Sequence, residues 1–81
     1  GKTTEMQNIS VSINKKQQFF INSERVSERS LERTINSQLK GQETPTILLR
    51  AEEGVPIEKA VKVMDIANRN KYKIVLAVKP E

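Results

Sequence analysis

The sequence lacks the two residue types that most often carry enzyme chemistry, because it contains no histidine and no cysteine. Histidine is the commonest general base and metal ligand, and cysteine supplies the thiolate that attacks substrates or binds soft metals. The acidic pairs Glu52–Glu53 and Glu24/Glu28 do not have the regular spacing of a loop that binds a metal through oxygen ligands. We interpret both pairs as solvated charge and predict no metal site.

Serine and glycine patterns do not suggest catalysis either. The three glycines, Gly1, Gly41 and Gly54, lie far apart, so they do not form a phosphate-binding loop. The serines do not occur in a GxSxG nucleophile turn. A Lys–Ser or paired-carboxylate enzyme is the only catalytic class that these residues leave open. We therefore expect no enzymatic activity and no cofactor.

The net charge of +4 would suit an anionic partner, such as nucleic acid, anionic lipid or a cell-wall polymer. The lysines and arginines are scattered, however, and the aromatic residues are only Phe19, Phe20 and Tyr72. Nucleic-acid surfaces usually interleave basic and aromatic residues on one face, and the sequence shows no such stripe. We predict ordinary solubilising charge and no nucleic-acid partner, with a small basic nucleic-acid-binding domain as an alternative.

The chain is long enough for one small folded domain. Residues 9–13 alternate apolar and polar side chains, which predicts a strand with one buried face. Polar residues 14–18 suit a hairpin turn, and residues 19–21 form a second, antiparallel strand. Residues 22–23 predict another turn, after which residues 25–26 add a short extension.

The first predicted helix runs over residues 28–40, after Ser27 as its N-cap. Gly41 is placed to end it in the left-handed conformation. Its apolar residues recur every four positions: Leu31, Ile35 and Leu39.

The second predicted helix begins with Pro56 in its first turn, ends near Arg69 and is followed by Asn70 as a left-handed cap. Its apolar face consists of Ile57, Ala60, Val61, Met64 and Ala67, widened by Val63 and Ile66.

Two further strands are predicted at residues 46–51 and 73–78. The consecutive residues Ile47, Leu48 and Leu49 indicate burial on both faces. The order strand–strand–helix–strand–helix–strand predicts a two-layer α+β fold. It has a mixed sheet of about four strands, with two helices packed on one face. The other face is partly polar, through Ser10, Ser12 and Arg50, so solvent or a partner would cover it.

The outer strands of such a sheet leave backbone donors and acceptors unpaired. An edge of this kind can recruit an extended peptide or a second copy of the chain. The flanking lysines Lys71, Lys73 and Lys79 restrain unspecific pairing while allowing a specific partner.

Three segments form a pattern beyond the order of elements: Phe20-Ile21-Asn22-Ser23-Glu24-Arg25-Val26, then ILLRAEEGVPIEKAVKVMDIANRN, and then Asn70-Lys71-Tyr72-Lys73-Ile74-Val75-Leu76. Together they resemble the periplasmic domain of the ExbD/TolR family of biopolymer transport proteins. The amino-acid sequence is more similar to ExbD than to TolR at Phe20-Ile21-Asn22 and at Lys62-Val63-Met64-Asp65. Asn70 replaces the glycine that the family has before the last strand, and Glu52 replaces its aspartate.

The resemblance implies residues 1–8 as a flexible linker after a transmembrane helix that this chain lacks, and residues 9–80 as the periplasmic domain. It implies an inner-membrane protein that dimerises and works with an ExbB-like subunit and a TonB-like protein, driven by the proton motive force. In the TolR-like alternative the domain binds peptidoglycan.

We expect the partner or dimer surface on the last strand, at Tyr72, Lys73, Ile74, Leu76 and Val78. The competing interpretation is that Leu76 belongs to the core.

Overall fold

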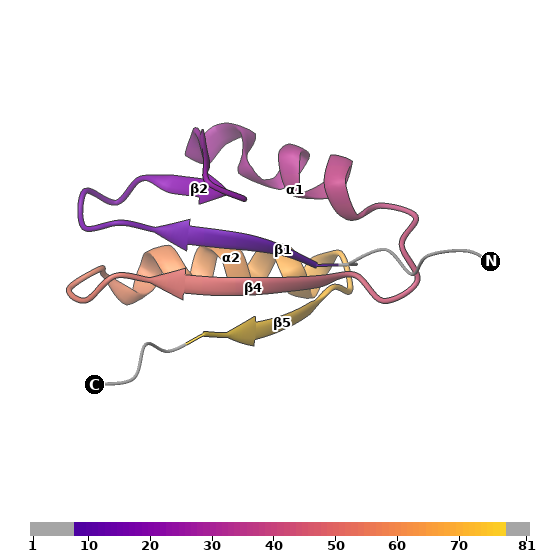
Figure 1. Ribbon diagram of the computed structural model, residues 1–81. Helices are drawn as coiled ribbons and strands as arrows, with labels where there is room; N and C mark the ends of the chain where they lie inside the picture. The colour runs from indigo at the N-terminus through magenta and orange to yellow at the C-terminus, as the bar shows by residue number, and fades with distance from the viewer. Residues whose placement is uncertain (1–7, 78–81) are drawn as a thin grey trace.

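The computed structural model describes residues 8–77, which form a two-layer α+β fold (Figure 1). The elements are β1 (Asn8–Ile13), β2 (Phe19–Ile21), β3 (Glu24–Val26), the 3-10 helix η1 (Glu28–Ser30), α1 (Leu31–Leu39), β4 (Thr46–Ala51), α2 (Ile57–Arg69) and β5 (Lys73–Leu76). The predicted fold class is therefore confirmed. Val78, Lys79 and the expected linker, apart from Asn8, lie outside the described residues.

The sheet is mixed and has five strands in the order β3-β2-β1-β4-β5. β1 pairs antiparallel with β2 and parallel with β4, and β4 pairs parallel with β5. The fifth strand arises because Asn22 and Ser23 both take positive φ angles, 50° and 77°, and reverse the chain. Residues 24–26 therefore return alongside β2 as β3, and the expected short extension is a strand of its own.

The core lies between the sheet and the two helices. Every second residue of β1 is buried, as are Ile47 and Leu49 of β4, and all three apolar residues of α1 are buried with them. Figure 1 looks onto the opposite face of the sheet, with α2 behind β1 and β4. That face is open among the described residues: Leu48 is only half-buried, so the expected burial of β4 on both faces is wrong.

The ends of the first helical segment follow local chemistry. The Ser27 hydroxyl accepts a hydrogen bond from the Ser30 backbone N–H at 3.2 Å, which confirms the predicted cap. The first turn is a 3-10 helix, and the α-helix starts only at Leu31. Gly41 has a φ of +87°, a backbone conformation that residues other than glycine rarely adopt.

The turn between α2 and β5 differs from the prediction. Asn70 has a φ of −102°, and the positive φ of 63° falls on Lys71. The Asn70 side chain donates to the Ile66 carbonyl and to the Glu32 carboxylate, both at 2.8 Å. Asparagine therefore joins the end of α2 to α1, a link that glycine could not make.

Candidate partner-binding edge

Strand β5 lies at one edge of the sheet, with β4 as its only described neighbour. The backbone N–H groups of Lys73 and Ala77 donate to the carbonyls of Pro45 and Leu49, at 2.9 and 2.8 Å. Because N–H groups alternate sides along a strand, those of Ile74 and Leu76 point away from β4. The outer side of β5 therefore offers backbone groups that an additional strand could bind.

The side chains of β5 are more exposed than its apolar sequence predicts. Val75 and Leu76 have relative exposures of 40% and 53%. Leu76 pairs in register with the buried Leu49, so it lies on the helix side of the sheet, yet nothing among the described residues covers it fully. Leu76 is therefore not a core residue in this structure.

A neighbouring flank of α2 carries two further exposed apolar residues, Ile57 at 68% and Val61 at 41%. The opposite flank of this helix faces α1, because Lys59, Lys62 and Arg69 bind carboxylates there. With about 100° of rotation per residue, Ile57 and Val61 lie on the flank away from α1. Since α2 packs on β4 and β5, this flank adjoins the β5 edge.

Ile57 and Val61 are functional candidates that the sequence analysis missed. It placed both residues on the buried face of the helix and treated Val63 and Ile66 as its margins. In the structure Val63 and Ile66 are buried, together with Ala60 and Ala67. Ile57 and Val61 are four residues apart and have charged neighbours in the sequence. This spacing fits either flank of an amphipathic helix, so it does not show which flank is exposed. We call the surface formed by Leu76, Ile57 and Val61 the edge surface.

The remaining predicted site residues do not all join this surface. Ile74 is half-buried against the core, and Lys73 is exposed on the open face, in register with Thr46. Tyr72 points elsewhere: its hydroxyl donates a hydrogen bond to the Asn36 side-chain oxygen in α1. The structure thus separates Tyr72 from Leu76, and Val78 lies outside the described residues.

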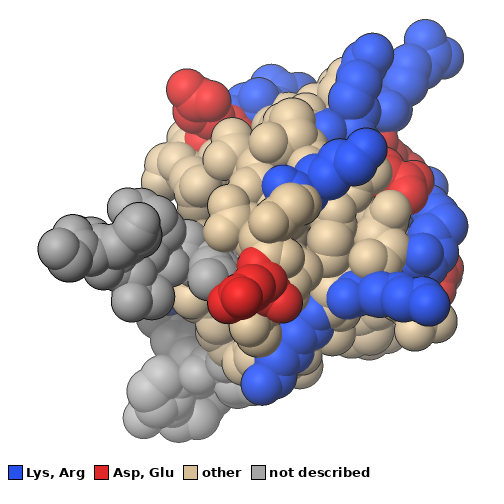
Figure 2. Space-filling view, turned by 90° about the vertical axis from the view of Figure 1, so that its right-hand side faces the viewer, with Lys and Arg blue, Asp and Glu red and all other residues tan. Residues whose placement is uncertain are grey.

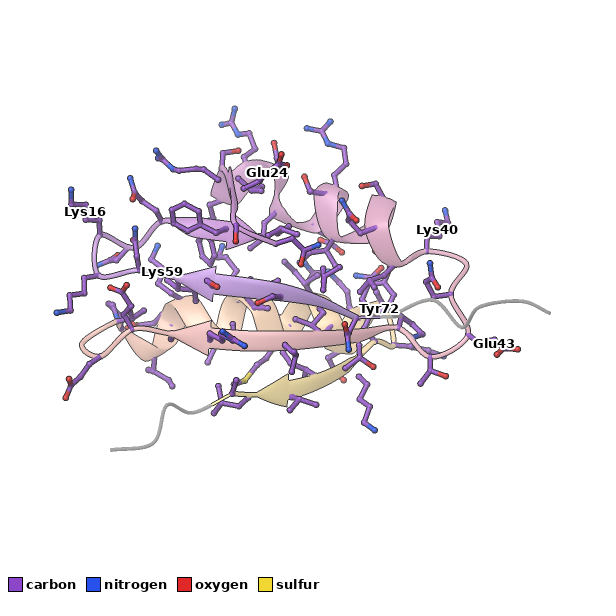
Figure 3. The ribbon with its side chains drawn as sticks, viewed as in Figure 1. Lys16, Glu24, Lys40, Glu43, Lys59 and Tyr72 are labelled. Carbon is purple, nitrogen blue, oxygen red and sulfur yellow. The ribbon has the colours of Figure 1, made fainter. Side chains whose placement is uncertain are left out.

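Tyr72 lines a shallow cavity of about 350 Å³ between the end of α1 and the α2–β5 turn. Figure 3 shows it at the end of the molecule that also carries Lys40 and Glu43. In Figure 2, which looks onto this end, Lys and Arg side chains together with some Asp and Glu side chains stand out from a largely uncharged surface. Burial raises the pKa of the Tyr72 phenol, and the nearby negative charge of Glu32 adds to this effect.

Two carboxylates hold the helices side by side. Glu28 accepts from Lys62 at 2.8 Å and from Lys59 at 3.2 Å, and Glu32 forms an ion pair with Arg69 at 2.7 Å. Hydrogen bonds from these basic groups hold the pKa values of both carboxyls below the usual range. Glu28 is exposed, as the interpretation as solvated charge expects, but it also forms two ion pairs that the sequence did not predict.

Glu52 also has a structural role. Its carboxylate accepts a hydrogen bond from the Lys15 backbone N–H at 2.8 Å, and its own N–H donates to the Ile13 carbonyl at 2.9 Å. The loop after β4 is thereby tied to the hairpin between β1 and β2. Glu52 therefore makes a hydrogen bond at the position where the resemblance expects aspartate.

Within residues 8–77, the side chains do not form a cluster of acidic residues suited to a metal ion. None of the helices in this part of the chain has the length and hydropathy needed to span a membrane.

The comparisons with known proteins agree with the resemblance in the sequence. The family model for the biopolymer transport protein ExbD/TolR matches residues 1–81. A search of curated proteins found no match. The match does not distinguish ExbD from TolR, but it covers the whole chain. The chain therefore belongs to the ExbD/TolR family, whose members are membrane-associated transport proteins rather than enzymes.

Proposed function

We propose that this chain is the periplasmic domain of an ExbD-like subunit of a proton-driven ExbB–ExbD–TonB complex. In this role the domain couples proton flow at the inner membrane to a TonB-like protein that drives outer-membrane uptake. Residues 1–8 link it to a transmembrane helix of the full-length protein, and residues 9–80 form the domain. The full-length protein acts as a dimer.

The observation that carries this proposal is the open β5 edge in a chain of this family. An extended segment of the partner adds to the sheet as a strand and hydrogen-bonds to the outward backbone groups of Ile74 and Leu76. Its side chains on the helix side contact Leu76, Ile57 and Val61, which are otherwise exposed to solvent. Backbone pairing supplies affinity, and the apolar contacts select the sequence.

The first experiment is an amide chemical-shift titration of the labelled domain with the periplasmic linker peptide of the TonB-like protein. We expect the largest shifts along β5 and at the exposed flank of α2. Shifts confined to other elements, or no response at millimolar peptide, would contradict the proposed edge.

Two substitutions at one position separate backbone pairing from side-chain contact. Leu76→Pro removes an N–H that points away from β4, so the bonds between β4 and β5 remain. Leu76→Ala removes the same side chain but keeps the N–H group. We expect the proline variant to lose peptide binding and the alanine variant to be only weakened.

The fold of both variants is checked by amide dispersion, and Gln38→Ala on α1, an exposed position, serves as the matched control. Equal binding by the proline and alanine variants would show that the partner does not pair with the backbone of β5.

A TolR-like subunit that binds peptidoglycan is the second candidate, and the net charge of +4 favours it. Binding to an anionic wall polymer would be electrostatic and would weaken with salt. Co-sedimentation with purified cell wall at low salt, together with no response to the TonB-like peptide, would favour this candidate. No co-sedimentation at low salt would remove it for the isolated domain.

A further inference from the structure

The open face of the sheet carries basic residues without acidic ones. The strand registers place ten side chains on it: Asn8, Ser10, Ser12, Phe20, Arg25, Thr46, Leu48, Arg50, Lys73 and Val75. Three of these are cationic, none is acidic, and the rest are polar or apolar. This open face lies on the side of the sheet that Figure 1 presents to the viewer.

The three cations are available to a partner. Arg25, Arg50 and Lys73 are all exposed, and none of them takes part in an ion pair within the described part of the chain. The carboxylates that do form ion pairs, Glu28 and Glu32, bind basic residues of α2 instead. The positive charge of the open face is therefore not neutralised locally.

The cations are too widely spaced for one small anion. Arg25 and Arg50 lie in the same row across the sheet, separated by three strand spacings, or about 14 Å. Lys73 lies one strand and four residues from Arg50, again about 14 Å away. The distance from Arg25 to Lys73 is about 23 Å by the same geometry. A single phosphate could not contact all three.

Polar side chains of β1 run along the middle of the face, and apolar residues lie on β2, β4 and β5. Phe20 lies in the row of the two arginines, and Leu48 pairs with Val75 in the adjacent row. Phe20 and Leu48 are half-buried, whereas Val75 is 40% exposed. The cavity beside Tyr72 and a second one beside α2 are not lined by residues of this face. The face is thus suited to a broad anionic surface rather than to an enclosed ligand.

We propose that the open face docks on the surface of a membrane that contains anionic phospholipids. A bilayer presents many phosphates in one plane, so Arg25, Arg50 and Lys73 can each bind a different headgroup. Phe20 and Leu48 lie between these cations, and Val75 lies beside Leu48 on β5, so all three apolar side chains would face the apolar boundary of the bilayer. An acidic peptide fits less well, because the inner strands have their backbone groups paired on both sides and offer it no strand to join.

This inference goes beyond the proposed partner at β5 and does not depend on it. It rests on the exposure, charge and spacing of Arg25, Arg50 and Lys73 on the open face. The open face and the edge surface share no residue, so the domain can lie on a bilayer while its β5 backbone edge binds a partner strand.

The test measures binding of the full 81-residue chain to vesicles of phosphatidylcholine mixed with phosphatidylglycerol, and to vesicles of phosphatidylcholine alone. The face variant is Arg25→Gln/Arg50→Gln/Lys73→Gln. The control variant is Arg29→Gln/Arg33→Gln/Lys40→Gln, on the helix side. Each lowers the net charge from +4 by three to +1. Circular dichroism confirms that both variants remain folded.

We expect binding to the anionic vesicles only, with a loss of about fivefold per charge removed from the face. The face variant should therefore bind roughly 100-fold more weakly, and the control variant should stay near the unsubstituted chain. Equal losses in both variants would show that net charge alone acts, and the proposal would be wrong. It would also be wrong if the chain bound cell-wall polymer or single-stranded oligonucleotide but not the anionic vesicles.

Discussion

Tyr72 is the only tyrosine in the chain, so its ionisation can be followed without interference. Burial and the charge of Glu32 raise its pKa above the ordinary value of 10.0. We predict a phenolate absorbance titration with a midpoint above that value in the folded chain and near it in denaturant. Glu32→Gln should lower the folded midpoint only partly, because burial is the larger cause.

The same shift predicts the alkaline limit of stability. The folded state holds the phenol proton more tightly than the unfolded state, so this contribution is fully present below pH 10 or so. It is lost as the pH rises through the folded pKa. Urea midpoints measured through this range should fall in the unsubstituted chain and fall less in Tyr72→Phe. A folded midpoint at or below the ordinary value would contradict both expectations.

Single residues show where reasoning from sequence succeeds and where it stops. Ser27 acts on a backbone group three residues away and Gly41 acts through its own backbone, and both roles match the prediction. Glu28, Glu32 and Asn70 act through partners more than 30 residues away in the chain. Those pairings depend on how the two helices are placed on the sheet. Local pattern contains no information about that placement.

At the scale of elements, α2 gives a direct test of which flank is buried. Val63 has a relative exposure of 0% and Val61 has one of 41%. We predict that Val63→Ala lowers the free energy of unfolding by about 2 kcal/mol, from lost apolar burial and an unfilled cavity. Val61→Ala should change it by about 0.5 kcal/mol or less. Equal effects in urea denaturation would show that the helix is rotated from the orientation described.

The rotation of α2 was difficult to predict because its apolar residues cover more than one flank. The pattern of apolar residues shows that the segment is a helix, but which face is buried depends on the elements against which the helix packs. Here the basic flank turns towards Glu28 and Glu32, which leaves Ile57 and Val61 on the outside. The two most exposed apolar residues of α2 were therefore assigned to the core.

The stabilisation that Glu28 and Glu32 provide by binding basic residues of α2 should depend on pH. Glu28 and Glu32 have lowered pKa values in the folded chain, so their stabilisation is present above the unfolded carboxyl pKa of about 4.3. It is lost as the pH falls through the folded values. The variant Glu28→Gln/Glu32→Gln should be less stable than the unsubstituted chain at pH 7, and the difference should shrink near pH 3.

The effect is expected to be small, because the two carboxylate side chains are 40% and 36% exposed. For Glu28 we expect about 1 kcal/mol or less, measured by urea denaturation at low salt. Glu58→Gln, at an exposed position of α2 without a described ion pair, is the control and should not show this pH dependence. A constant difference at both pH values would mean that the ion pairs do not stabilise the helix contact.

At the scale of the whole molecule, the element order and the burial of one face were sufficient to predict the fold class. The additional strand depended on the tight turn at Asn22 and Ser23, and a stretch as short as residues 24–26 carries little pattern of its own. The open face could be anticipated from Ser10, Ser12 and Arg50. Strand register was needed to bring Phe20 between Arg25 and Arg50 on that face.

The β5 edge of the sheet determines how readily the whole molecule associates with a second copy. β5 is apolar and exposed, and Lys71 and Lys73 flank its beginning. Lysines at an edge oppose pairing with a second copy, because two aligned edges would bring like charges together. We predict that Lys71→Asn/Lys73→Thr increases self-association, measured by sedimentation velocity over a range of concentrations. Asparagine is chosen at position 71 because it tolerates the positive φ there.

The addition of Leu76→Pro to that variant tests whether β5 is the edge that pairs. The proline removes an outward N–H group while leaving the inward bonds of Lys73 and Ala77 to the β4 side in place. The triple variant should therefore return to the monomer, whereas the addition of Leu76→Ala should not fully restore it. If proline and alanine have the same effect, the association occurs through a side-chain surface, and strand addition at β5 is not its mechanism.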